Sequence, residues 1–515
     1  MRTCTAATSR GGGAGGTAIC LCLAERTLAA ALGELERNRG VVDLAELRAD
    51  SLSHAELGGV PSFCRAAGVP LVLAFRRASD GGSWRGTEEE RSAALLRALR
   101  DGEFAYVELE EGFDPPGVRE ACARRGTRII RSRHVPDGLP ADLGGALASL
   151  GAEASEIPKL AVTPRGSRDL LALVSAAKST PPPPAGRILC GMGEFGLATG
   201  ILAARVGSLL AYCFPLADPA VPGRPTAREL RELYRFGSIR ASTVLFAVAG
   251  NPVAHSLSPH IHNRGLAAAG VDAVYVPFLV DDVPAFLEAA VLLGTRGVSV
   301  TIPHKLSVIP FLSRRDPSVE RIGACNTLVR EPSGWFGTNT DWIGFLRALE
   351  RGSGLRPDGD TRATVLGAGG GAWAVVYALR SRGCSVLVLN RDARRAQALA
   401  GEFGCSSAPL GSEGEGRIAS HADLIVQCTS CGMDPLRDCD PIEGYRFRGS
   451  EVLFELVYRP ELTLLAARAR DAGCLTVGGI EMLLEQAYEQ FRLFTGAEYP
   501  RELRGAAFLE PPAGL

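Results

Sequence analysis

Lysine is the residue type whose placement says most about chemistry in this chain of 515 residues. Of 56 basic residues only three are lysine, namely Lys159, Lys178 and Lys305, so arginine serves wherever a generic surface cation is needed. Lysine, unlike arginine, exchanges a proton near neutral pH and forms Schiff bases with ketones. Lys159 and Lys305 are therefore candidates for amine chemistry, whereas Lys178, beside the tetraproline stretch 181–184, shows that a lysine also survives by chance.

A glycine-rich turn between two apolar runs predicts a dinucleotide site. It matches the pattern G-x-G-x-x-A, with Ala372 last, after the expected strand 363–366 and before a helical stretch that reaches Arg380. Glycines in this pattern let the backbone approach a pyrophosphate, and the N-terminus of the following helix favours its charge. The expected pyrophosphate contacts are Gly367, Ala368, Gly369, Gly370 and Gly371.

The end of the next expected strand, 385–389, indicates which dinucleotide is selected. A site that selects NAD usually carries Asp or Glu there to hold the ribose 2′-hydroxyl, but this chain has Asn390 and Arg391, with Arg395 just beyond. Guanidinium groups at this corner suit the 2′-phosphate of NADP, which is therefore the expected cofactor. The alternative is the solvated start of a basic helix, which Asp392 between the arginines favours.

The first half of the chain, from residue 17 to about 236, alternates apolar runs with helical stretches. Eight strand–helix units over this length predict a (β/α)8 barrel, whose reactive groups lie at the carboxyl ends of the strands. Polar residues stand at those ends, and Lys159 lies within the sixth run. The polar residues are Glu46, Arg48, Arg76 and His134, and the expected strands are 18–24, 41–48, 70–76, 106–110, 128–134, 157–163, 187–192 and 209–215.

A second α/β pattern follows the barrel. It opens with the expected strand 243–249, continues to about Glu350 and ends in a turn-rich joint, 352–360, ahead of the glycine loop. The strand, glycine turn, helix and second strand beyond that joint have the layout of a Rossmann domain. The tetraproline stretch 181–184 precedes the seventh barrel strand and is interpreted as a stiff loop, so the boundary of the barrel is expected near 236–242.

Composition limits the kind of partner. The net charge is −1 and the pI about 6.7, which provides no field for nucleic acid or anionic lipid and indicates small-molecule partners. No apolar run reaches the ~18 residues that span a bilayer, and residues 1–16 lack the layout of a signal peptide, so a cytoplasmic protein is expected. The 14 cysteines lack the spacing of a metal site, and most are expected to be reduced and buried.

The polar stretch 250–263, the glycine loop and five further motifs together resemble shikimate dehydrogenase. They follow the order of that family from Thr243 to about Pro500. The resemblance implies a substrate-binding domain, a Rossmann domain for NADP, and the reduction of 3-dehydroshikimate to shikimate. The five motifs are residues 300–305, 323–328, 337–341, 455–458 and 479–486.

The resemblance assigns roles to residues in these motifs. It implies Lys305 and Asp341 as the catalytic pair, because ketone reduction needs a proton donor for the new alkoxide and a carboxylate that holds the donor in place. The alternatives are a surface ion pair for Lys305 and a helix cap for Asp341. The implied substrate pocket consists of Ser256, Ser258, Thr301, Asn326, Tyr458 and Gln486, and the implied further cofactor contacts are Leu456 and Gly479.

The barrel resembles type I 3-dehydroquinate dehydratase. The resemblance implies a Schiff base between Lys159 and the substrate ketone, with His134 moving the proton that is lost together with water. A lysine among apolar neighbours is expected to have a depressed pKa, and the alternative is a lysine whose amine reaches solvent. The motifs are 42–50, 74–76, 80–82, His134, 158–161 and 192–196, and the implied substrate contacts include Glu46, Arg48 and Arg76.

Several positions depart from the family patterns. Gly200 stands where the dehydratase family has the arginine that binds the substrate carboxylate, and Ala220 and Arg224 replace a serine and a glutamine. Because a buried carboxylate without a cationic partner is costly, Arg224 is expected to supply the missing charge. Asp80 stands for a glutamate in this half, and the dehydrogenase half departs at residues 427–430 and at Glu455, where the family commonly has Asp.

These interpretations predict a bifunctional enzyme of the shikimate pathway that acts on 3-dehydroquinate and 3-dehydroshikimate. The alternatives are a monofunctional dehydrogenase with an impaired barrel, and a regulatory protein that binds quinate or shikimate without turning it over. The expected segments are the barrel (1–236), the substrate domain (237–350), the Rossmann domain (351–478) and C-terminal helices that return to the substrate domain (479–515).

Overall fold

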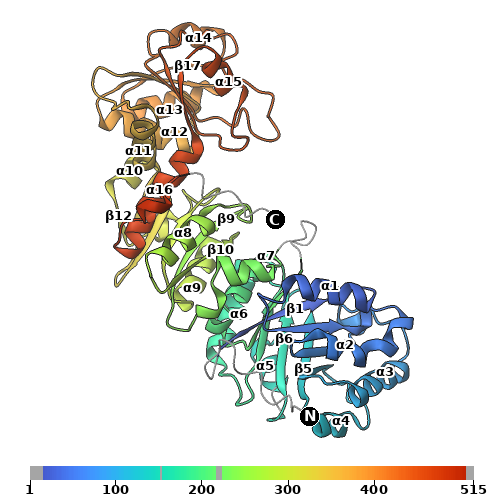
Figure 1. The fold of residues 1–515 in the computed structure, drawn as a ribbon. Coiled ribbons are helices and arrows are strands. Elements are labelled where there is room, and N and C mark those ends of the chain that lie inside the picture. The colour runs from blue at the N-terminus through green and yellow to red at the C-terminus, as the bar shows by residue number, and fades with distance from the viewer. Residues whose placement is uncertain (1–15, 151–152, 216–222, 506–515) are drawn as a thin grey trace. The chain divides into compact units, whose positions relative to one another are not determined.

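The computed structural model describes residues 16–150, 153–215 and 223–505. Contacts divide the chain into two compact units, one formed by Met1–Pro259 with Asp272–Thr295 and the other by His260–Val271 with Arg296–Leu515. The first unit holds the barrel, and the second holds the Rossmann sheet (Figure 1). No helix in the described part of the chain is long and apolar enough to cross a membrane.

The expected (β/α)8 barrel is confirmed. Eight parallel strands follow one another in the order β7-β6-β5-β4-β3-β2-β1-β8, and a bridge between Arg187 and Ser208 connects the two ends of this order. Each apolar run predicted from the sequence corresponds to one strand, and most of these strands are largely buried. The strands are β1 (Ala18–Leu23), β2 (Leu44–Arg48), β3 (Leu71–Ala74), β4 (Tyr106–Glu110), β5 (Arg128–Val135), β6 (Ile157–Val162), β7 (Ile188–Gly191) and β8 (Leu210–Cys213).

Several helices of the barrel begin at clear capping residues. Thr27 caps α1 (Leu28–Asn38) by accepting the Ala30 N–H at 3.2 Å. At α3 (Glu88–Asp101), Thr87 and Glu90 form a capping box in which each side chain accepts the backbone N–H of the other. The other barrel helices are α2 (Val60–Ala67), α4 (Val118–Arg125), α5 (Leu143–Leu150), α6 (Ser167–Ser179) and α7 (Gly193–Ile201).

The barrel interior contains an apolar layer with a polar layer next to it. The apolar layer clusters Cys20, Leu44, Val72, Ile130, Ile157, Ile188 and Leu210, with Tyr106 packed against it. Because side chains alternate along a strand, the residues two positions further on share the same interior and lie nearer the carboxyl ends. Those residues are Cys22, Glu46, Ala74, Glu108, Ser132, Lys159, Cys190 and Tyr212.

Between the barrel and the glycine loop, the described residues form six further strands. In the first unit, β9 and β10 pair in parallel. In the second unit, β11 and β14 both pair antiparallel with β13, and the short β12 adds in parallel to β14. The elements are β9 (Val244–Gly250), α8 (Ser258–Ala268), β10 (Ala273–Leu279), α9 (Val283–Leu292), β11 (Thr295–Val300), β12 (Arg314–Arg315), α10 (Pro317–Ile322), β13 (Thr327–Glu331), β14 (Gly334–Thr338) and α11 (Asp341–Ser353).

The Rossmann layout is also confirmed. Six parallel strands lie in the order β17-β16-β15-β18-β19-β20, so the strand order reverses beside β15, where nucleotides bind in such sheets. The C-terminal helix α16 packs along α11, where a Cβ added at Gly344 would lie 2.8 Å from the Gln486 nitrogen. The elements are β15 (Arg362–Leu366), α12 (Gly370–Ser381), β16 (Ser385–Asn390), α13 (Ala393–Phe403), β17 (Ser406–Pro409), α14 (Ser412–Ile418), β18 (Leu424–Gln427), β19 (Val452–Glu455), α15 (Leu464–Asp471), β20 (Leu475–Gly478) and α16 (Gly479–Thr495).

Candidate active sites

The polar layer of the barrel gathers charge around Lys159. Its Nζ lies 2.5 Å from Glu108 Oε2, 2.9 Å from the Tyr212 hydroxyl and 3.3 Å from Glu46 Oε2. These partners come from β4, β8 and β2, and Lys159 itself is 2% exposed. The amine therefore faces other side chains, and the alternative in which it reaches solvent is wrong.

Arg76 balances the charge of the two carboxylates in this cluster. The Arg76 guanidinium lies 3.0 Å from Glu108 Oε1 and 3.3 Å from Glu46 Oε1, so it bridges both acids. Arg48 is held differently, because it donates two hydrogen bonds, of 2.9 and 2.7 Å, to the buried carboxylate of Asp50. Of the predicted contacts, Glu46 and Arg76 are thus part of the cluster around Lys159, while Arg48 is held beside it by Asp50.

The predicted depression of the Lys159 pKa is wrong. Burial lowers this pKa, but the carboxylates of Glu108 and Glu46 outweigh burial and raise it above its ordinary value. Burial likewise disfavours a charged Glu108, yet Lys159 and Arg76 hold the pKa of that carboxyl well below its usual range. The apolar residues beside Lys159 in the sequence belong to its own strand, whereas the groups that contact Nζ come from other strands. The resting site therefore holds an ammonium–carboxylate pair.

His134, at the end of β5, is held in its neutral form. Its side chain is 4% exposed, and burial together with the charge of Arg76 holds its pKa well below the usual value. Nε2 lies 3.3 Å from Glu108 Oε1 without the alignment of a hydrogen bond, and neither ring nitrogen has a hydrogen-bond partner among the described residues. A neutral imidazole beside the amine suits proton transfer.

Lys305 and Asp341 meet in the second unit. The Lys305 Nζ lies 2.6 Å from Asp341 Oδ2, and Asn326 donates to the other oxygen of Asp341 at 2.8 Å. Thr340, rather than Asp341, is the N-cap of α11, so the cap alternative for Asp341 is wrong. The Lys305 side chain is 24% exposed and that of Asp341 11%, which leaves the pair accessible to a substrate while a buried amide orients its acid.

Most of the remaining predicted pocket residues lie at or near the ends of elements, and Gln486 lies within α16. Asn326 Nδ2 also reaches Gln486 Oε1, on α16, at 3.5 Å. Thr301 directly follows β11 and is half-buried, and Tyr458 follows β19 with 39% of its surface exposed. In the first unit, the Ser258 N–H donates to the Ser256 hydroxyl at 3.3 Å, at the start of α8. Within the second unit, Asn326 therefore connects Asp341 with Gln486.

The glycine loop after β15 leaves room for a dinucleotide. Gly369 is the N-cap of α12 and Gly370 its first residue, and a Cβ added at either would meet nothing within 4 Å. Gly367 has a φ of +110°, a conformation that favours glycine. Open space in front of a helix N-terminus is what a pyrophosphate requires, so these residues fit the expected cofactor.

At the end of β16, the residue between the arginines acts as a helix cap. Asp392 accepts the N–H groups of Arg394 and Arg395 at 3.0 and 3.4 Å, and Asn390 Nδ2 donates to the Asp392 carbonyl at 3.0 Å. Arg391 is exposed beside this cap. Asp392 is therefore explained by helix capping, and its presence does not argue against a phosphate beside Arg391.

Glu455, at the end of β19, holds the turn that follows it. Its carboxylate accepts the Val457 N–H at 2.9 Å and the Thr463 hydroxyl at 2.8 Å. Burial raises the pKa of Glu455 to about 7. A Cβ added at Gly479 would lie 2.2 Å from the Leu456 carbonyl oxygen, so only glycine permits α16 to begin this close to Leu456.

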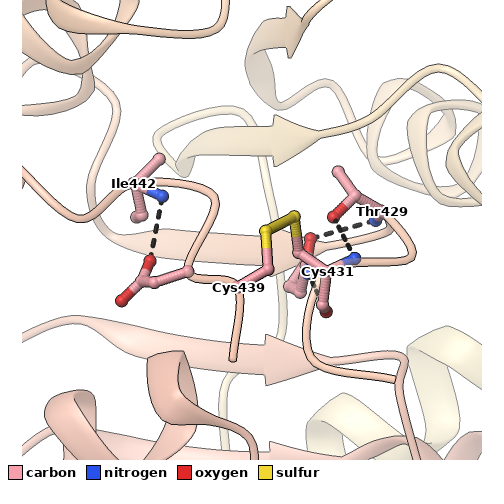
Figure 2. The surroundings of a disulfide bond; sticks show 6 residues. Thr429, Cys431, Cys439 and Ile442 are labelled. Carbon is pink, nitrogen blue, oxygen red and sulfur yellow. Dashed lines mark hydrogen bonds between the residues drawn. A yellow bond between two sulfur atoms is a disulfide. The ribbon is translucent and has the colours of Figure 1, made fainter. Parts of the chain in front are cut away.

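A disulfide that the sequence did not indicate joins Cys431 and Cys439 in the loop after β18 (Figure 2). The Cys431 N–H donates to the Thr429 hydroxyl at 3.1 Å, and the Cys431 carbonyl accepts from Gln427 Nε2 at 3.0 Å. The other cysteines in the described ranges are free thiols, most of them buried, as expected. Nothing in the sequence spacing of the cysteines distinguishes the bonded pair from the free ones.

Family models match the chain along most of its length. The type I 3-dehydroquinase model matches residues 19–240, the shikimate dehydrogenase substrate binding domain 248–328, the shikimate/quinate 5-dehydrogenase 356–440 and the shikimate 5′-dehydrogenase C-terminal domain 479–503. A chloroplastic relative from Arabidopsis thaliana, a bifunctional 3-dehydroquinate dehydratase/shikimate dehydrogenase, is 31% identical over 90% of this chain and 79% of its own length. The chain belongs to this bifunctional family.

Relatives named as shikimate dehydrogenases align with about half of this bifunctional chain. The NADP(+) shikimate dehydrogenase of Moorella thermoacetica is 43% identical and aligns over 54% of the chain and 99% of its own length. The corresponding protein of Thermococcus kodakarensis is 39% identical over 52% of the chain and 97% of its own length. The bifunctional chain therefore contains the full length of a dehydrogenase behind its dehydratase barrel.

The dehydratase half of the bifunctional chain departs from its family at the positions noted in the sequence. A Cβ added at Gly200, on α7, would meet nothing within 4 Å, so open space lies where the family's arginine begins. Arg224 is exposed, and its guanidinium lies 4.4 Å from the ring centroid of Phe214, directly after β8. Its neighbour Gly223 packs against Gly193, at the start of the same α7. Ala220 lies outside the described residues.

Sequence reasoning missed two groups of the dehydratase half, Glu108 and Tyr212. Both follow an interior residue by two positions, in the same register as Lys159 and Glu46. Strand alternation applied to all eight strands would have found them, because it places Lys159, Glu46, Glu108 and Tyr212 in one layer.

Proposed function

We propose that this chain catalyses two successive steps of the shikimate pathway, the dehydration of 3-dehydroquinate to 3-dehydroshikimate and the reduction of that product to shikimate with NADPH. The observation that carries the proposal is that two of its three lysines each contact a carboxylate, at 2.5 Å for Lys159 and Glu108 and at 2.6 Å for Lys305 and Asp341. Each pair lies in the half that resembles the corresponding enzyme. Separate assays of the purified chain with 3-dehydroquinate and with shikimate test the two activities.

In the dehydrogenase half, Lys305 acts as the proton donor. When bound, NADPH supplies the hydride to the ketone carbon. The Lys305 ammonium protonates the developing alkoxide, and Asp341 holds that ammonium while Asn326 orients Asp341. The pocket around the substrate is formed by Ser256, Ser258, Thr301, Tyr458 and Gln486, with Leu456 and Gly479 on the cofactor side.

In the dehydratase half, Lys159 forms a Schiff base with the substrate ketone. The resulting iminium withdraws electrons from the neighbouring C–H bond, and His134 removes that proton before the hydroxyl leaves as water. Glu46, Arg48 and Arg76 surround the substrate. A barrel that binds but does not react would have no use for a buried lysine held among two acids and an imidazole.

The cofactor preference is expected to depend on Arg391. Replacing Arg391 with Ala removes one charge-assisted contact to the 2′-phosphate, worth ~1.5–3 kcal/mol, and is expected to raise the KM for NADP by about 10- to 100-fold while leaving the KM for NAD nearly unchanged. Steady-state shikimate oxidation with each cofactor measures this difference. Arg394→Ala, on the same helix start, serves as a matched control, and equal effects of Arg391→Ala on both cofactors would contradict the assignment.

Binding of the 3-dehydroquinate carboxylate is expected to depend on Arg224. A buried carboxylate needs a cationic partner, and Arg224 lies next to Gly223, which packs against the start of the helix that carries Gly200. Arg224→Ala is expected to raise the dehydratase KM by about 10- to 100-fold with a smaller change in kcat. Initial rates over a range of 3-dehydroquinate concentrations measure both constants. An unchanged KM would show that another group binds the carboxylate.

The organisation of the chain completes the proposal. The barrel occupies residues 1–236, the substrate domain 237–350, the Rossmann domain 351–478 and the returning C-terminal helices 479–515. The partners are small molecules rather than nucleic acid, and the enzyme acts in the cytoplasm. The near-neutral charge supports the first statement.

A further inference from the structure

In the resting barrel site, Lys159 carries a proton that it has to lose before a Schiff base can form. A lysine attacks a ketone only as the neutral amine. Lys159 Nζ, however, lies 2.5 Å from one carboxylate and 3.3 Å from another, and the residue is 2% exposed. Both carboxylates raise its pKa. Because bulk water has little access to this buried amine, a group inside the barrel has to accept the proton.

The charged and titratable groups that face Lys159 and Glu108 differ in their ability to take a proton. Arginine stays protonated throughout, and burial raises the pKa of the cysteines and of Tyr212, so these groups already carry their protons. Glu46 and Glu108 are proton acceptors by type, and His134 is a neutral base with both ring nitrogens lacking hydrogen-bond partners among the described residues. The facing groups are Cys20 and Cys22 of β1, Glu46 and Arg48 of β2, Arg76 after β3, Glu108 of β4, His134 of β5, Lys159 of β6, Cys190 of β7 and Tyr212 of β8.

We propose that Glu108 relays the proton of the Lys159 ammonium to His134 before the amine attacks the ketone. Its Oε2 lies 2.5 Å from Lys159 Nζ, and its Oε1 lies 3.3 Å from His134 Nε2, so one carboxylate bridges the donor and the acceptor. The inference rests on the proposed dehydratase function. It adds to that function a route by which the buried amine becomes a nucleophile.

The proton transfers of this relay involve only three side chains, and no proton is gained or lost overall. The proton first passes from Lys159 Nζ to Glu108 Oε2. The terminal torsion of Glu108 is soft and two-fold, so a half turn about it carries the protonated oxygen towards His134, whose Nε2 then accepts the proton. Lys159 thereby loses one proton, His134 gains one, and Glu108 returns to the carboxylate. The imidazolium is then in place to give its proton to the carbinolamine hydroxyl, which leaves as water when the iminium forms.

Arg76 prevents Glu108 from retaining the proton that it receives from Lys159. Its guanidinium lies 3.0 Å from Glu108 Oε1 and, together with Lys159, keeps the pKa of this carboxyl well below its usual range. A carboxyl with a low pKa passes a proton on instead of retaining it. The half turn exchanges the positions of the two Glu108 oxygens. Arg76 therefore faces one oxygen of this carboxyl group both before and after the transfer.

A purely electrostatic role for Glu108 predicts the opposite result when the charge is removed. The carboxylate raises the pKa of Lys159, so Glu108→Gln should lower that pKa and increase the neutral amine present at pH 7. If Glu108 only held the ammonium in place, Schiff-base formation in Glu108→Gln would be faster than in the wild-type chain. If Glu108 relays the proton, Schiff-base formation would be slower, because glutamine does not accept and release a proton.

The experiment measures Schiff-base formation in the full-length chain by mixing it with 3-dehydroquinate, quenching into borohydride after milliseconds to seconds, and determining the labelled fraction by intact mass. At pH 7, Glu108→Gln is expected to be labelled about 10²-fold more slowly than wild type, and the deficit is expected to shrink towards pH 10 as hydroxide deprotonates the amine. Glu108→Asp retains a carboxylate and is expected to recover part of the rate. Glu156→Gln removes an equally buried carboxylate, paired with Arg131 at 2.8 Å, and controls for loss of such a charge.

Each outcome decides one of the two proposals. Labelling of Glu108→Gln at or above the wild-type rate at pH 7 contradicts the relay while leaving the dehydratase proposal intact. A folded Glu108→Asp that is labelled no faster than Glu108→Gln also contradicts the relay. A wild-type chain that is never labelled removes the dehydratase proposal and the relay with it. Thermal unfolding of each variant, compared with that of the wild-type chain, verifies that the barrel is folded.

Discussion

Replacing Lys305 with Ala is expected to lower kcat for shikimate oxidation by about 10²- to 10⁴-fold, because the reaction loses its positioned proton-transfer group. The KM for NADP is expected to change little, since the glycine loop and Arg391 belong to a separate part of the fold. Dehydration of 3-dehydroquinate should proceed at the wild-type rate, because the barrel has its own lysine. Steady-state rates of both reactions with the same protein preparation measure these effects.

The control for this variant is Lys178→Ala, which removes the third lysine of the chain. Lys178 is exposed in the last turn of α6 and contacts neither lysine–carboxylate pair. Both activities are therefore expected to remain unchanged. A Lys305→Ala protein that keeps the wild-type kcat would contradict the role of Lys305 as the acid, and Asp341 would then have to be examined as the group that acts alone.

Replacing Lys159 with Ala is expected to abolish dehydratase activity, with a loss of more than about 10⁴-fold, because the covalent intermediate and the electron-withdrawing iminium both disappear. Borohydride should no longer attach the substrate to the chain. Shikimate oxidation should be unaffected. The substitution also leaves Glu108 and Glu46 without their shared ammonium, so thermal unfolding has to be compared with that of wild type.

A second variant, Lys159→Arg, distinguishes the effect of losing the positive charge from the effect of losing the reactive amine. Arginine preserves a cation beside the two acids but forms no Schiff base, so it should restore stability without restoring turnover. Dehydratase activity that persists in Lys159→Arg would contradict the covalent mechanism. Loss of activity in Lys159→Arg at normal stability would support it.

Much of the fold was predictable because local patterns and the final structure agree. Most barrel strands and the strands on either side of the glycine loop are largely buried and stand out as apolar runs, such as β6 and β15. The antiparallel β13 and β14 were not predicted, because these strands carry partly exposed residues such as Arg330. Patterns of burial therefore reveal the central strands and miss the peripheral ones.

The candidate sites were predictable to a different degree in each half. Lys305, Asp341 and Asn326 stand in motifs and were found together in the structure. In the barrel, the lysine was identified, but its pKa was predicted in the wrong direction, because the sequence around Lys159 shows the apolar residues of its own strand. The acids that determine its protonation come from β2 and β4, more than 50 residues earlier in the chain.

The most direct test of the account is a single-protein assay in which the purified chain receives 3-dehydroquinate and NADPH and nothing else. Wild type is expected to oxidise NADPH at a sustained rate, Lys159→Ala and Lys305→Ala separately are expected to oxidise almost none, and an equimolar mixture of the two variants is expected to recover oxidation. Lys159→Ala should still oxidise NADPH when it is given 3-dehydroshikimate. A wild-type chain that oxidises NADPH with 3-dehydroshikimate but not with 3-dehydroquinate would contradict the bifunctional assignment.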